Sequence, residues 1–430
     1  MESRFQVPRG TYDLLPEEAA RRQRIVAEAR ALAEGAGFGQ IETPIFEDSE
    51  LFVRTVGEAT DIVSKEMYSF EDRSGRSLTL RPEGTAPVCR SYIEHGMHKL
   101  PQPVKLWYEG PMFRYEAPQA GRFRQHAQFG VEAIGSDDPA LDAELIDLLG
   151  HLYARLDLSA VRLHLTSIGT PESRREYARE LRDFLLRSDA FDADQRERIG
   201  INPMRAFDWD ASEIRAVTQD APKMVDRLAD DDREHFEEVR RLLDGAGIDY
   251  VVDPRLVRGL DYYTRTVFEF RSDALGGQSG LGGGGRYDRL IEQIGGNPTP
   301  GVGWATGLER IAQAMEASGS AESGVTGANG LGPRFLFAVT EPAARERVFR
   351  AVSELREEGL GATIDLGERS LKTQMRHAAR AGVSWVVIVG PDEWSRDAAV
   401  IRDMSAHRQE EVALSALRRE LVTRARGTRA

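Results

Sequence analysis

The stretch that decides the fold of this chain is Trp107 to Gly135, WYEGPMFRYEAPQAGRFRQHAQFGVEAIG. Its two ends are rich in aromatic and branched residues, as β-strands are, and its middle, Ala117 to Gly121, carries the proline and glycine of a loop. The pattern therefore predicts a long antiparallel hairpin. Arg114 and Glu116 leave the first predicted strand two residues apart, so they share a face.

Charged side chains crowd this predicted hairpin. They are three arginines and two glutamates: Arg114, Arg122, Arg124, Glu116 and Glu132. Gln128 shares a face of the return strand with Glu132. Because each guanidinium fork binds two oxygens, arginines gathered near a loop suit a polyphosphate. A solvated, salt-bridged hairpin would carry the same residues, and this stretch alone leaves both interpretations open.

The composition is that of an ordinary globular protein. With 430 residues, 41% hydrophobic and 30% charged, the chain is long enough for two or three domains. It contains no apolar run of about 18 residues, and MESRFQVPRG lacks the apolar core of a signal peptide, so we expect a cytoplasmic protein. The single cysteine, Cys89, excludes an internal disulfide and a Cys-rich zinc site. We expect it to be a small buried hydrophobe.

The charge is unevenly distributed along the chain. A net charge of −13 counts against a nucleic-acid binder when it is averaged over the whole surface. Residues 333–430, however, hold 17 lysines and arginines against 14 acidic residues, a balance of +3. This segment could touch an RNA backbone, although a solvated surface fits the same balance.

The first third of the chain predicts elements that lead to the hairpin. A helix is expected over Glu17 to Gly35, and a short strand over IETPIFE (41–47). Pro44 cannot donate to a ladder, so that strand belongs at an edge, and we expect a dimer seam over Ile41 to Val53. MYSFED and SLTLRPE form a second predicted hairpin, which delivers Arg81 and Glu83 into a tight turn at Gly84 before a helix over 86–94.

Beyond the central hairpin, a helix is predicted over 140–156 and a strand in VRLHLTSIG (161–169). Charged helical patterns at about 171–247 indicate a helical insertion, after which LVRGLDYYTRTVFEFR returns to strand. Gly276 to Gly285 matches neither GxxxxGK[ST] nor a strand-GxGxxG-helix unit, so a nucleotide loop has little support, and close packing between strands explains these glycines as well. GVGWATGLERIAQAM has the form of a strand running into a helix.

The stretch 316–332 is a linker of small residues. Past it, apolar strands alternate with helices over 333–430, which predicts a small α/β domain with a mostly parallel sheet. We therefore expect three parts: a domain over 1–325 that contains the helical insertion, the linker at its end, and the α/β domain.

Together these motifs resemble the histidyl-tRNA synthetases of class II. IETPIFE resembles motif 1 of the class, GPMFRYE with its loop and return strand resembles motif 2, and GVGWATGLERI resembles motif 3. LVRGLDYYTRTVFEF and the GGGGRYD segment resemble two signatures of the histidine-specific enzymes. The resemblance runs from PRGTYDLLP through the C-terminal domain. It implies a catalytic domain built on an antiparallel sheet flanked by helices, with a helical insertion and a C-terminal α/β anticodon-binding domain.

The resemblance also implies roles for individual residues. Those implied to surround the histidine substrate are Glu83, Gly84, Thr85, Arg114, Gln128, Glu132, Arg258, Tyr262 and Tyr263. Those implied to bind ATP are Arg114, Glu116, Arg122, His126 and Arg310. Arg114 and Arg258 are the implied catalytic residues, beside the α-phosphate. Many relatives carry a phenylalanine that stacks on adenine at the position of His126, so the chain departs from the pattern there.

The reaction implied is the ATP-dependent ligation of L-histidine to tRNA(His) through a histidyl-adenylate, with Mg²⁺ bound to ATP and no metal held by the protein alone. A cytoplasmic homodimer that binds neither membrane nor DNA is expected. The alternative is the non-catalytic relative that serves as a regulatory subunit of ATP phosphoribosyltransferase in histidine biosynthesis. Such proteins generally lack the anticodon domain and the arginine at the position of Arg258, and both are present here.

Overall fold

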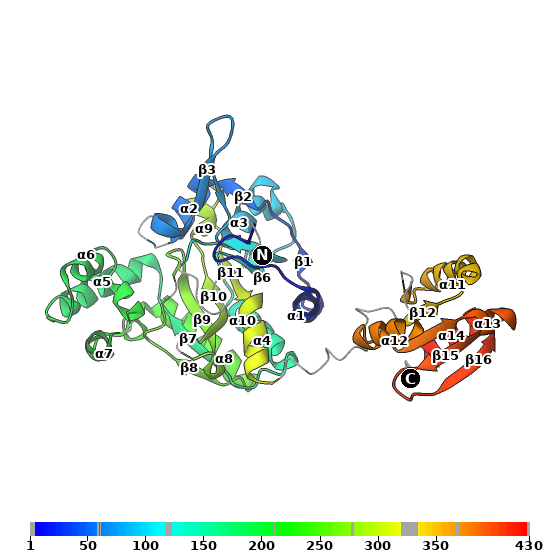
Figure 1. Cartoon of the computed structure of the whole chain (residues 1–430). Coiled ribbons are helices and arrows are strands. Elements are labelled where there is room, and N and C mark those ends of the chain that lie inside the picture. The colour runs from blue at the N-terminus through cyan, green and yellow to red at the C-terminus, as the bar shows by residue number, and fades with distance from the viewer. Residues whose placement is uncertain are drawn as a thin grey trace. The chain divides into compact units, whose positions relative to one another are not determined.

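The computed structural model of the chain describes residues 5–57, 60, 62–116, 123–209, 211–257, 259–276, 279–319, 334–365 and 370–427. The chain divides into two compact units, Met1–Ala321 and Glu322–Ala430 (Figure 1). Among the described residues, the first unit contains two β-sheets and the second contains one, and each unit has its own buried hydrophobic core.

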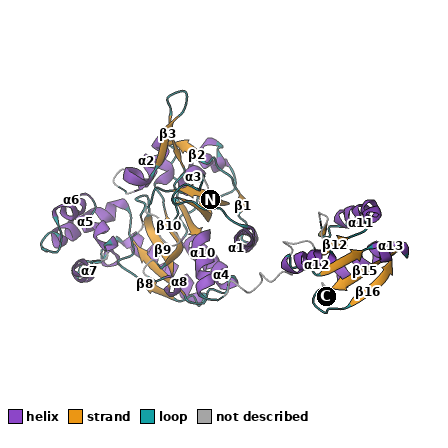
Figure 2. Ribbon diagram, viewed as in Figure 1, coloured by secondary structure: helices purple, strands orange, loops and turns teal. Residues whose placement is uncertain are grey.

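An eight-stranded sheet forms the centre of the first unit, with helices packed around it (Figure 2). In spatial order the strands are β1 (Gly39–Gln40), β5 (Val104–Phe113), β6 (Gln125–Ile134), β11 (Gly301–Gly307), β10 (Gly280–Arg286), β9 (Thr264–Ser272), β7 (Val161–Ser167) and β8 (Tyr250–Val252). Neighbours run antiparallel except at the two edges, where β1 with β5 and β7 with β8 are parallel. The predicted antiparallel sheet flanked by helices is confirmed.

The predicted central hairpin is also confirmed. It consists of β5 and β6, which pair from Val104 opposite Ile134 to Phe113 opposite Gln125. The tip of the hairpin, residues 117–122, lies outside the described residues. Trp107 of β5 stacks on Phe129 of β6 with their ring centroids 5.3 Å apart. This aromatic pair, buried in the main core, anchors the hairpin.

Three long helices cover the sheet: α1 (Pro16–Gly35), α4 (Pro139–Arg155) and α10 (Leu308–Ala317). Helix α1 contacts both others, and it shares β6 with α10. The sequence marks where two of them begin, because Pro16 and Pro139 occupy first-turn positions that need no N–H donor. Asp138 caps α4 by accepting the Ala140 N–H at 2.9 Å.

A smaller three-stranded sheet corrects the strand predicted over 41–47. Residues 41–45 are irregular, and only β2 (Phe46–Asp48) pairs with β4 (Ser77–Leu80), which in turn pairs with β3 (Tyr68–Glu71). Pro44 has no N–H to donate to a neighbouring strand. The carbonyl oxygen of Thr43 instead accepts a hydrogen bond from Arg81 Nη1 at 2.9 Å. The motif 1 segment therefore crosses between the two sheets. The predicted hairpin of β3 and β4 is confirmed.

Short helices complete this part of the first unit: α2 (Ser49–Val56), α3 (Thr85–Glu94) and α9 (Leu290–Gln293). Helix α3 follows the tight turn at Gly84 as predicted. Cys89, on α3, is fully buried and unpaired, which confirms its expected role as a small hydrophobe.

The stretch at about 171–247 forms α5 (Pro171–Leu185), α6 (Ala193–Ile201), α7 (Ser212–Gln219) and α8 (Asp230–Gly245). In Figure 1 the helices α5, α6 and α7 gather at one side of the first unit, in green. Helix α8 packs along α4. Through α8 the insertion is joined to the helices that cover the main sheet.

The glycine-rich segment forms strand β10, which supports the interpretation as close packing between strands. A Cβ atom added at Gly284 would lie 1.9 Å from the carbonyl oxygen of Gly303 on β11. No side chain larger than hydrogen fits between these strands. The glycines therefore serve the sheet.

The second unit contains a five-stranded sheet in the order β13-β12-β14-β15-β16. Its elements are β12 (Phe335–Val339), α11 (Arg345–Glu357), β13 (Ala362–Ile364), α12 (Leu371–Arg380), β14 (Trp385–Val389), α13 (Pro391–Ser395), β15 (Ala398–Asp403), β16 (Gln409–Ala413) and α14 (Leu417–Gly427). The α/β class is confirmed, but "mostly parallel" is wrong, because β15 and β16 form an antiparallel hairpin on β14. Its turn holds His407 at a left-handed φ of 54°, which the sequence did not reveal.

None of the described helices is both long enough and apolar enough to cross a membrane.

Candidate active site

Glu132 lies at the centre of the site, near the C-terminal end of β6, and is fully buried. Its Oε1 accepts hydrogen bonds from Thr85 Oγ1 at 2.7 Å and from the Tyr108 hydroxyl at 3.3 Å. Its Oε2 accepts one from the Tyr287 hydroxyl at 2.6 Å. Burial raises the pKa of Glu132 to about 8, and the hydroxyl donors oppose that rise. The carboxylate is thus held by neutral donors.

Glycines make room for this arrangement. Gly303 pairs with Glu132 across β11 and β6, and a Cβ added there would lie 1.8 Å from Glu132 Oε2. The Tyr108 ring passes between Gly84 and Gly130, where added Cβ atoms would lie 2.3 and 2.4 Å from it. The glycines of three separate segments are therefore needed to bring a carboxylate and a phenol together.

Glu83 lies two residues before the start of helix α3 and is almost fully buried. Its Oε2 accepts the Thr85 N–H at 2.5 Å, and its Oε1 accepts the Ala86 N–H at 2.9 Å. Burial raises the pKa of Glu83, while these backbone donors and nearby Arg114 oppose the rise. Among the described residues, no ion pair to an arginine holds Glu83 or Glu132, so the salt-bridge interpretation does not describe them.

Gln128 and Arg114 lie at the loop end of the hairpin. Gln128 Oε1 is buried and has no hydrogen-bond partner among the described residues. Arg114 follows β5, donates from Nε to the Pro82 carbonyl at 2.8 Å, and places Nη1 3.8 Å from Glu116 Oε1. A buried acceptor without a donor costs free energy, and a ligand that supplies an N–H relieves that cost.

Tyr262 and Tyr263 are both buried, just before β9. Their ring centroids are 4.7 Å apart, and the Tyr262 ring meets the Tyr287 ring edge-on at 6.0 Å. Because the Tyr287 hydroxyl reaches Glu132, the rings of Tyr262, Tyr263 and Tyr287 form a tyrosine wall on that side of the carboxylate. Asp261, one residue earlier, lies 3.4 Å from Arg205 of the helical insertion.

The residues predicted for ATP are only partly described. Burial lowers the pKa of His126 to about 3, and Arg114 adds to this effect, so the ring is neutral at neutral pH. Arg310, on α10, donates from Nε to the Gly280 carbonyl at 3.2 Å and from Nη1 to Gln313 Oε1 at 3.2 Å. Arg122 and Arg258 lie outside the described residues.

Arg124, predicted as one of the arginines of the central hairpin, makes contacts with other parts of the protein. Its guanidinium lies over the Tyr115 ring, 3.6 Å from the centroid. Its backbone N–H donates to the Gly10 carbonyl at 2.7 Å, and its carbonyl accepts the Arg114 N–H at 2.9 Å. Arg124 therefore ties the N-terminal segment to both sides of the hairpin.

Tyr108 and Tyr287 are site residues that sequence reasoning did not assign. Both lay within quoted motifs, Tyr108 in the central hairpin and Tyr287 in GGGGRYD. The sequence signal that could have pointed to them is Glu132 itself, because it lies in a strand that is predicted to be buried. A buried carboxylate needs hydrogen-bond donors from its neighbours. Register between strands then decides which hydroxyls supply them, and register is not readable from one sequence.

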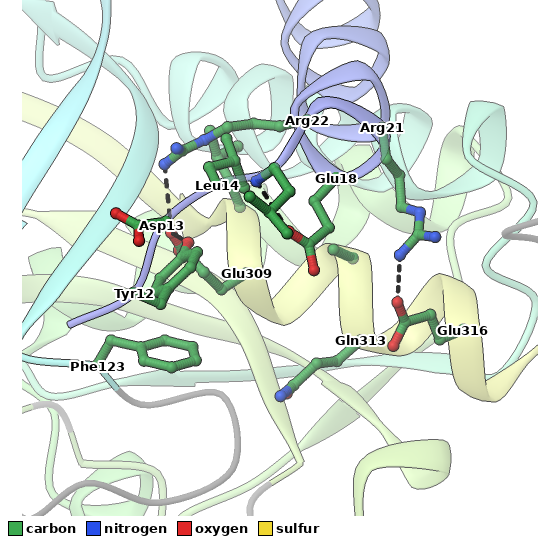
Figure 3. Close-up of a pocket in the computed structure, with 13 residues that line it drawn as sticks. Tyr12, Asp13, Leu14, Glu18, Arg21, Arg22, Phe123, Glu309, Gln313 and Glu316 are labelled. Atoms are coloured by element: carbon green, nitrogen blue, oxygen red, sulfur yellow. Dashed lines mark hydrogen bonds and ion pairs between the residues drawn. The ribbon is translucent and has the colours of Figure 1, made fainter. Parts of the chain in front are cut away.

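A separate hollow of about 390 Å³ lies between the N-terminal segment, the start of α1 and helix α10 (Figure 3). In this hollow the Tyr12 hydroxyl donates to Glu309 Oε1 at 2.7 Å, and the Tyr12 ring lies 4.5 Å from the Phe123 ring. Glu309 also accepts the Ala127 N–H from β6 at 3.0 Å. The hollow thus adjoins the helix that carries Arg310, but neither Glu132 nor the tyrosine wall lines it.

Among the described residues, no cluster of three or more His, Cys, Asp or Glu side chains could hold a metal ion.

Comparison with known proteins agrees with this geometry. The model of the family "Histidyl-tRNA synthetase" matches residues 10–311, and that of "Anticodon binding domain" matches residues 335–424. The chain is 48% identical over 421 residues to the "Histidine--tRNA ligase" of Desulforudis audaxviator, with 98% of this chain and 99% of the relative covered. It is 46% identical over 416 residues to that of Desulforamulus reducens, at 96% and 97% coverage.

Among solved structures, the chain is similar to apo S. aureus histidyl-tRNA synthetase. The TM-score is 0.81 at 36% sequence identity, and the match covers 97% of this chain and 99% of that one. The likeness therefore spans both units of the chain.

Proposed function

The chain belongs to the histidyl-tRNA synthetase family, a family of class II aminoacyl-tRNA synthetases, and we propose that the site around Glu132 is where it binds L-histidine. The protein catalyses the ATP-dependent ligation of histidine to tRNA(His), with AMP and diphosphate as products. The assignment of residues around Glu132 rests on the geometry of the site, and that of the ATP residues and Arg258 rests on their places in the sequence motifs.

The observation that carries the proposal is a fully buried carboxylate held only by hydroxyl donors. An imidazole offers N–H donors that such a carboxylate accepts. When a site is built around a buried polar group, a ligand without the matching donor leaves that group unpaired. Glu132 would accept the imidazole N–H, and the wall of Tyr262, Tyr263 and Tyr287 would pack against the ring.

The α-amino group of histidine would lie nearer Gln128, Glu83 and Thr85. Gln128 Oε1 is a buried acceptor without a partner among the described residues, and an ammonium supplies such a donor. The Glu83 carboxylate adds negative charge beside it. Gly84 contributes by leaving space for the Tyr108 ring.

For ATP, we propose that Arg114 binds the α-phosphate, Glu116 faces adenine, and Arg310 takes the γ-phosphate side. Arg122 would also contact ATP. His126 would stack on adenine as a neutral ring, since its pKa of about 3 keeps it uncharged. We further propose that Mg²⁺ enters with ATP. That ion needs only one or two protein carboxylates beside the phosphate oxygens, and it neutralises their charge.

In the first step a carboxylate oxygen of histidine attacks the α-phosphorus of ATP, the bond to the bridging oxygen breaks, and diphosphate leaves. In the second, the terminal adenosine hydroxyl of tRNA attacks the carbonyl of the adenylate, and AMP leaves. Protein groups form no covalent bond in the first step, so positioning and charge neutralisation dominate it. Arg114 and Arg258 are the residues proposed for that neutralisation.

The regulatory-subunit alternative is less well supported. The similarity to histidine–tRNA ligases covers 96% or more of the chain in the relatives named above. It includes a segment that matches an anticodon-binding domain, which the regulatory relatives generally lack. Arg258 is also present in the sequence.

We propose that a catalytic domain spans 1–325, with its helical insertion at about 171–247, that the linker is 316–332, and that the domain at 333–430 binds the anticodon of tRNA(His). Lys372 and Arg376 lie one turn apart on α12 and are proposed to contact RNA. Arg369, three residues before Lys372, is proposed to contact RNA as well and lies outside the described residues. Replacing both α12 residues with glutamate should weaken tRNA charging and spare adenylate formation; unchanged charging would rule out this surface.

A cytoplasmic homodimer is proposed on the strength of an exposed apolar patch. Ile45, Phe46 and Phe70 are each 44% to 51% exposed, and the two aromatic rings meet edge-on at 6.3 Å. Strand β2, which carries Phe46, is the edge strand of its sheet. A second copy would cover this edge. Light scattering that gives the monomer mass of 47.9 kDa at micromolar concentration would contradict the proposal.

Exchange of radiolabelled diphosphate into ATP, measured with each of the twenty amino acids, tests the proposed function. Histidine alone should support exchange, because rejection of amino acids that cannot pair with a buried carboxylate reaches roughly 10⁴-fold in such sites. Comparable exchange with proline or threonine, or none with any amino acid, would overturn it.

A further inference from the structure

Three side chains of the helical insertion hold the short segment that carries the tyrosine wall. Arg174, on α5, donates from Nη2 to the carbonyl of Tyr263 at 2.7 Å. Arg205 places Nη2 3.4 Å from Asp261 Oδ1. Asp232, on α8, accepts from Arg265 Nε at 3.0 Å. Side chains of the insertion therefore contact segment 261–265 at three of its five residues.

The backbone of this segment departs from regular strand geometry. Arg265 has a φ of +48°, in the left-handed region that non-glycine residues rarely adopt. Its N–H donates to the Gly169 carbonyl at 2.9 Å, and its carbonyl accepts the Ile168 N–H at 2.9 Å. Such a conformation persists when the surroundings fix it, and here the residues just before α5 do so.

One carboxylate joins the start of α5 to the same segment. Asp232 Oδ2 accepts the Thr170 N–H at 2.9 Å and the Ser173 hydroxyl at 2.9 Å, while Oδ1 accepts from Arg265. Thr170 is the N-cap of α5, and Arg174 follows one turn later. Helix α5 and segment 261–265 are consequently fixed against each other, with the Arg174 guanidinium between them.

A chain of contacts leads from Arg174 to the buried carboxylate. Tyr263, whose carbonyl Arg174 binds, has its ring 4.7 Å from that of Tyr262. Tyr262 meets Tyr287 at 6.0 Å, and Tyr287 donates to Glu132. A shift of the Tyr263 backbone would move both tyrosines that face the imidazole in the proposed pocket.

We propose that Arg174 is a positioning residue for histidine recognition, which makes the helical insertion part of the amino-acid specificity of the enzyme. The inference rests on the proposed histidine pocket. Arg174 acts through the Tyr263 carbonyl and sets the position of Tyr262 and Tyr263 relative to Glu132. Arg174 does not touch the substrate. Because it holds the segment that carries two tyrosines of the histidine pocket, it affects the affinity for histidine and leaves ATP binding unchanged.

The test is steady-state diphosphate exchange with the full chain, with histidine and ATP varied separately. Arg174→Met keeps the aliphatic stem and removes the donors. It should raise the KM for histidine roughly tenfold while kcat and the KM for ATP stay within about twofold, because one partly buried, charge-assisted hydrogen bond is lost. Arg174→Lys retains one donor and should recover part of that loss.

Arg175→Met is the matched control. Arg175 is the next residue on α5 and is exposed, with Glu172 3.9 Å away, and its replacement should leave both KM values at wild type. A wild-type KM for histidine in Arg174→Met would overturn this inference and leave the proposed function standing. A merely structural role for Arg174 would also overturn it. That role would appear as equal rises in the KM for histidine and the KM for ATP, a lowered unfolding midpoint, and no recovery in Arg174→Lys. If the wild type fails to exchange with histidine, the proposed function falls, and the inference with it.

Discussion

The Tyr287 hydroxyl donates to Glu132 Oε2 at 2.6 Å, which joins the residue after β10 to the C-terminal part of β6 across 155 positions of sequence. A tyrosine hydroxyl favours the ionised form of the carboxylate that it bonds. It therefore both orients Glu132 and lowers its pKa against the effect of burial.

Tyr287→Phe removes only that hydroxyl. We expect the KM for histidine to rise by roughly 5- to 10-fold, since a buried carboxylate loses a donor. The lower-pH limb of kcat/KM should also move to higher pH, because the pKa of Glu132 rises without the bond. Tyr92→Phe is the control, since it removes a hydroxyl that donates to Gln102 Oε1 at 3.2 Å, away from Glu132. An unchanged pH profile in Tyr287→Phe would contradict this role.

Glu132 should also make stability depend on pH. Its pKa rises from 4.5 to about 8 on folding, so the folded state binds more protons between those values. Its contribution to the free energy of unfolding is therefore full below pH 4.5 and is lost as pH rises through about 8. Glu132→Gln cannot titrate, so its stability relative to wild type should increase from acid to mildly alkaline pH. Urea unfolding of both proteins at several pH values measures this difference, and a constant difference would refute it.

Gly303 is predicted to be irreplaceable even by alanine. The added Cβ would lie 1.8 Å from Glu132 Oε2 and 2.6 Å from the Val131 carbonyl. Gly303→Ala should abolish exchange and cost about 1–3 kcal/mol of stability through overpacking. Gly39→Ala, in strand β1 with nothing within 4 Å of the new Cβ, is the control and should retain activity. Wild-type exchange by Gly303→Ala would show that Glu132 is not confined as described.

Most of the fold could be predicted from the sequence because periodicity and turn residues are local signals. The central hairpin, the helix after Gly84 and the strand that leads into α10 all carry them. The prediction of a strand over 41–47 was wrong because Pro44 has no N–H for strand pairing. The carbonyl of Thr43 instead accepts a hydrogen bond from Arg81, which is distant in sequence. The β15–β16 hairpin was missed because its turn relies on a left-handed histidine, which composition does not mark.

Prediction of the site was less complete for a similar reason. Glu132 and Tyr263 could be named because they belong to motifs, whereas the hydroxyls that hold Glu132 depend on strand register. Arg174 had no signal at all, since in sequence it is one charge among many on an amphipathic helix. Its partner is a backbone carbonyl, which no side-chain pattern reports.

Arg258 is expected to separate this enzyme from its regulatory relatives. Charge accumulates at the α-phosphate during attack, and a fixed guanidinium stabilises that transition state more than the ground state. Arg258→Ala should lower single-turnover adenylate formation about 10²- to 10³-fold, and Arg258→Lys should restore only part of it. The structural alternative is that Arg258 only pairs with a nearby carboxylate such as Asp261, which already has Arg205 3.4 Å away. A normal rate with a lowered unfolding midpoint would end the catalytic assignment.

The central claim is that Glu132 recognises the histidine imidazole, and histidine-dependent diphosphate exchange by Glu132→Gln tests it most directly. The measurement is made above pH 8, where Glu132 is mostly ionised. There the amide keeps the shape of the carboxylate and removes its charge. We predict that the KM for histidine rises at least roughly tenfold, because a charge-assisted hydrogen bond is lost, while the KM for ATP is unchanged and the unfolding midpoint is retained or raised. A wild-type KM for histidine in this variant would contradict the account.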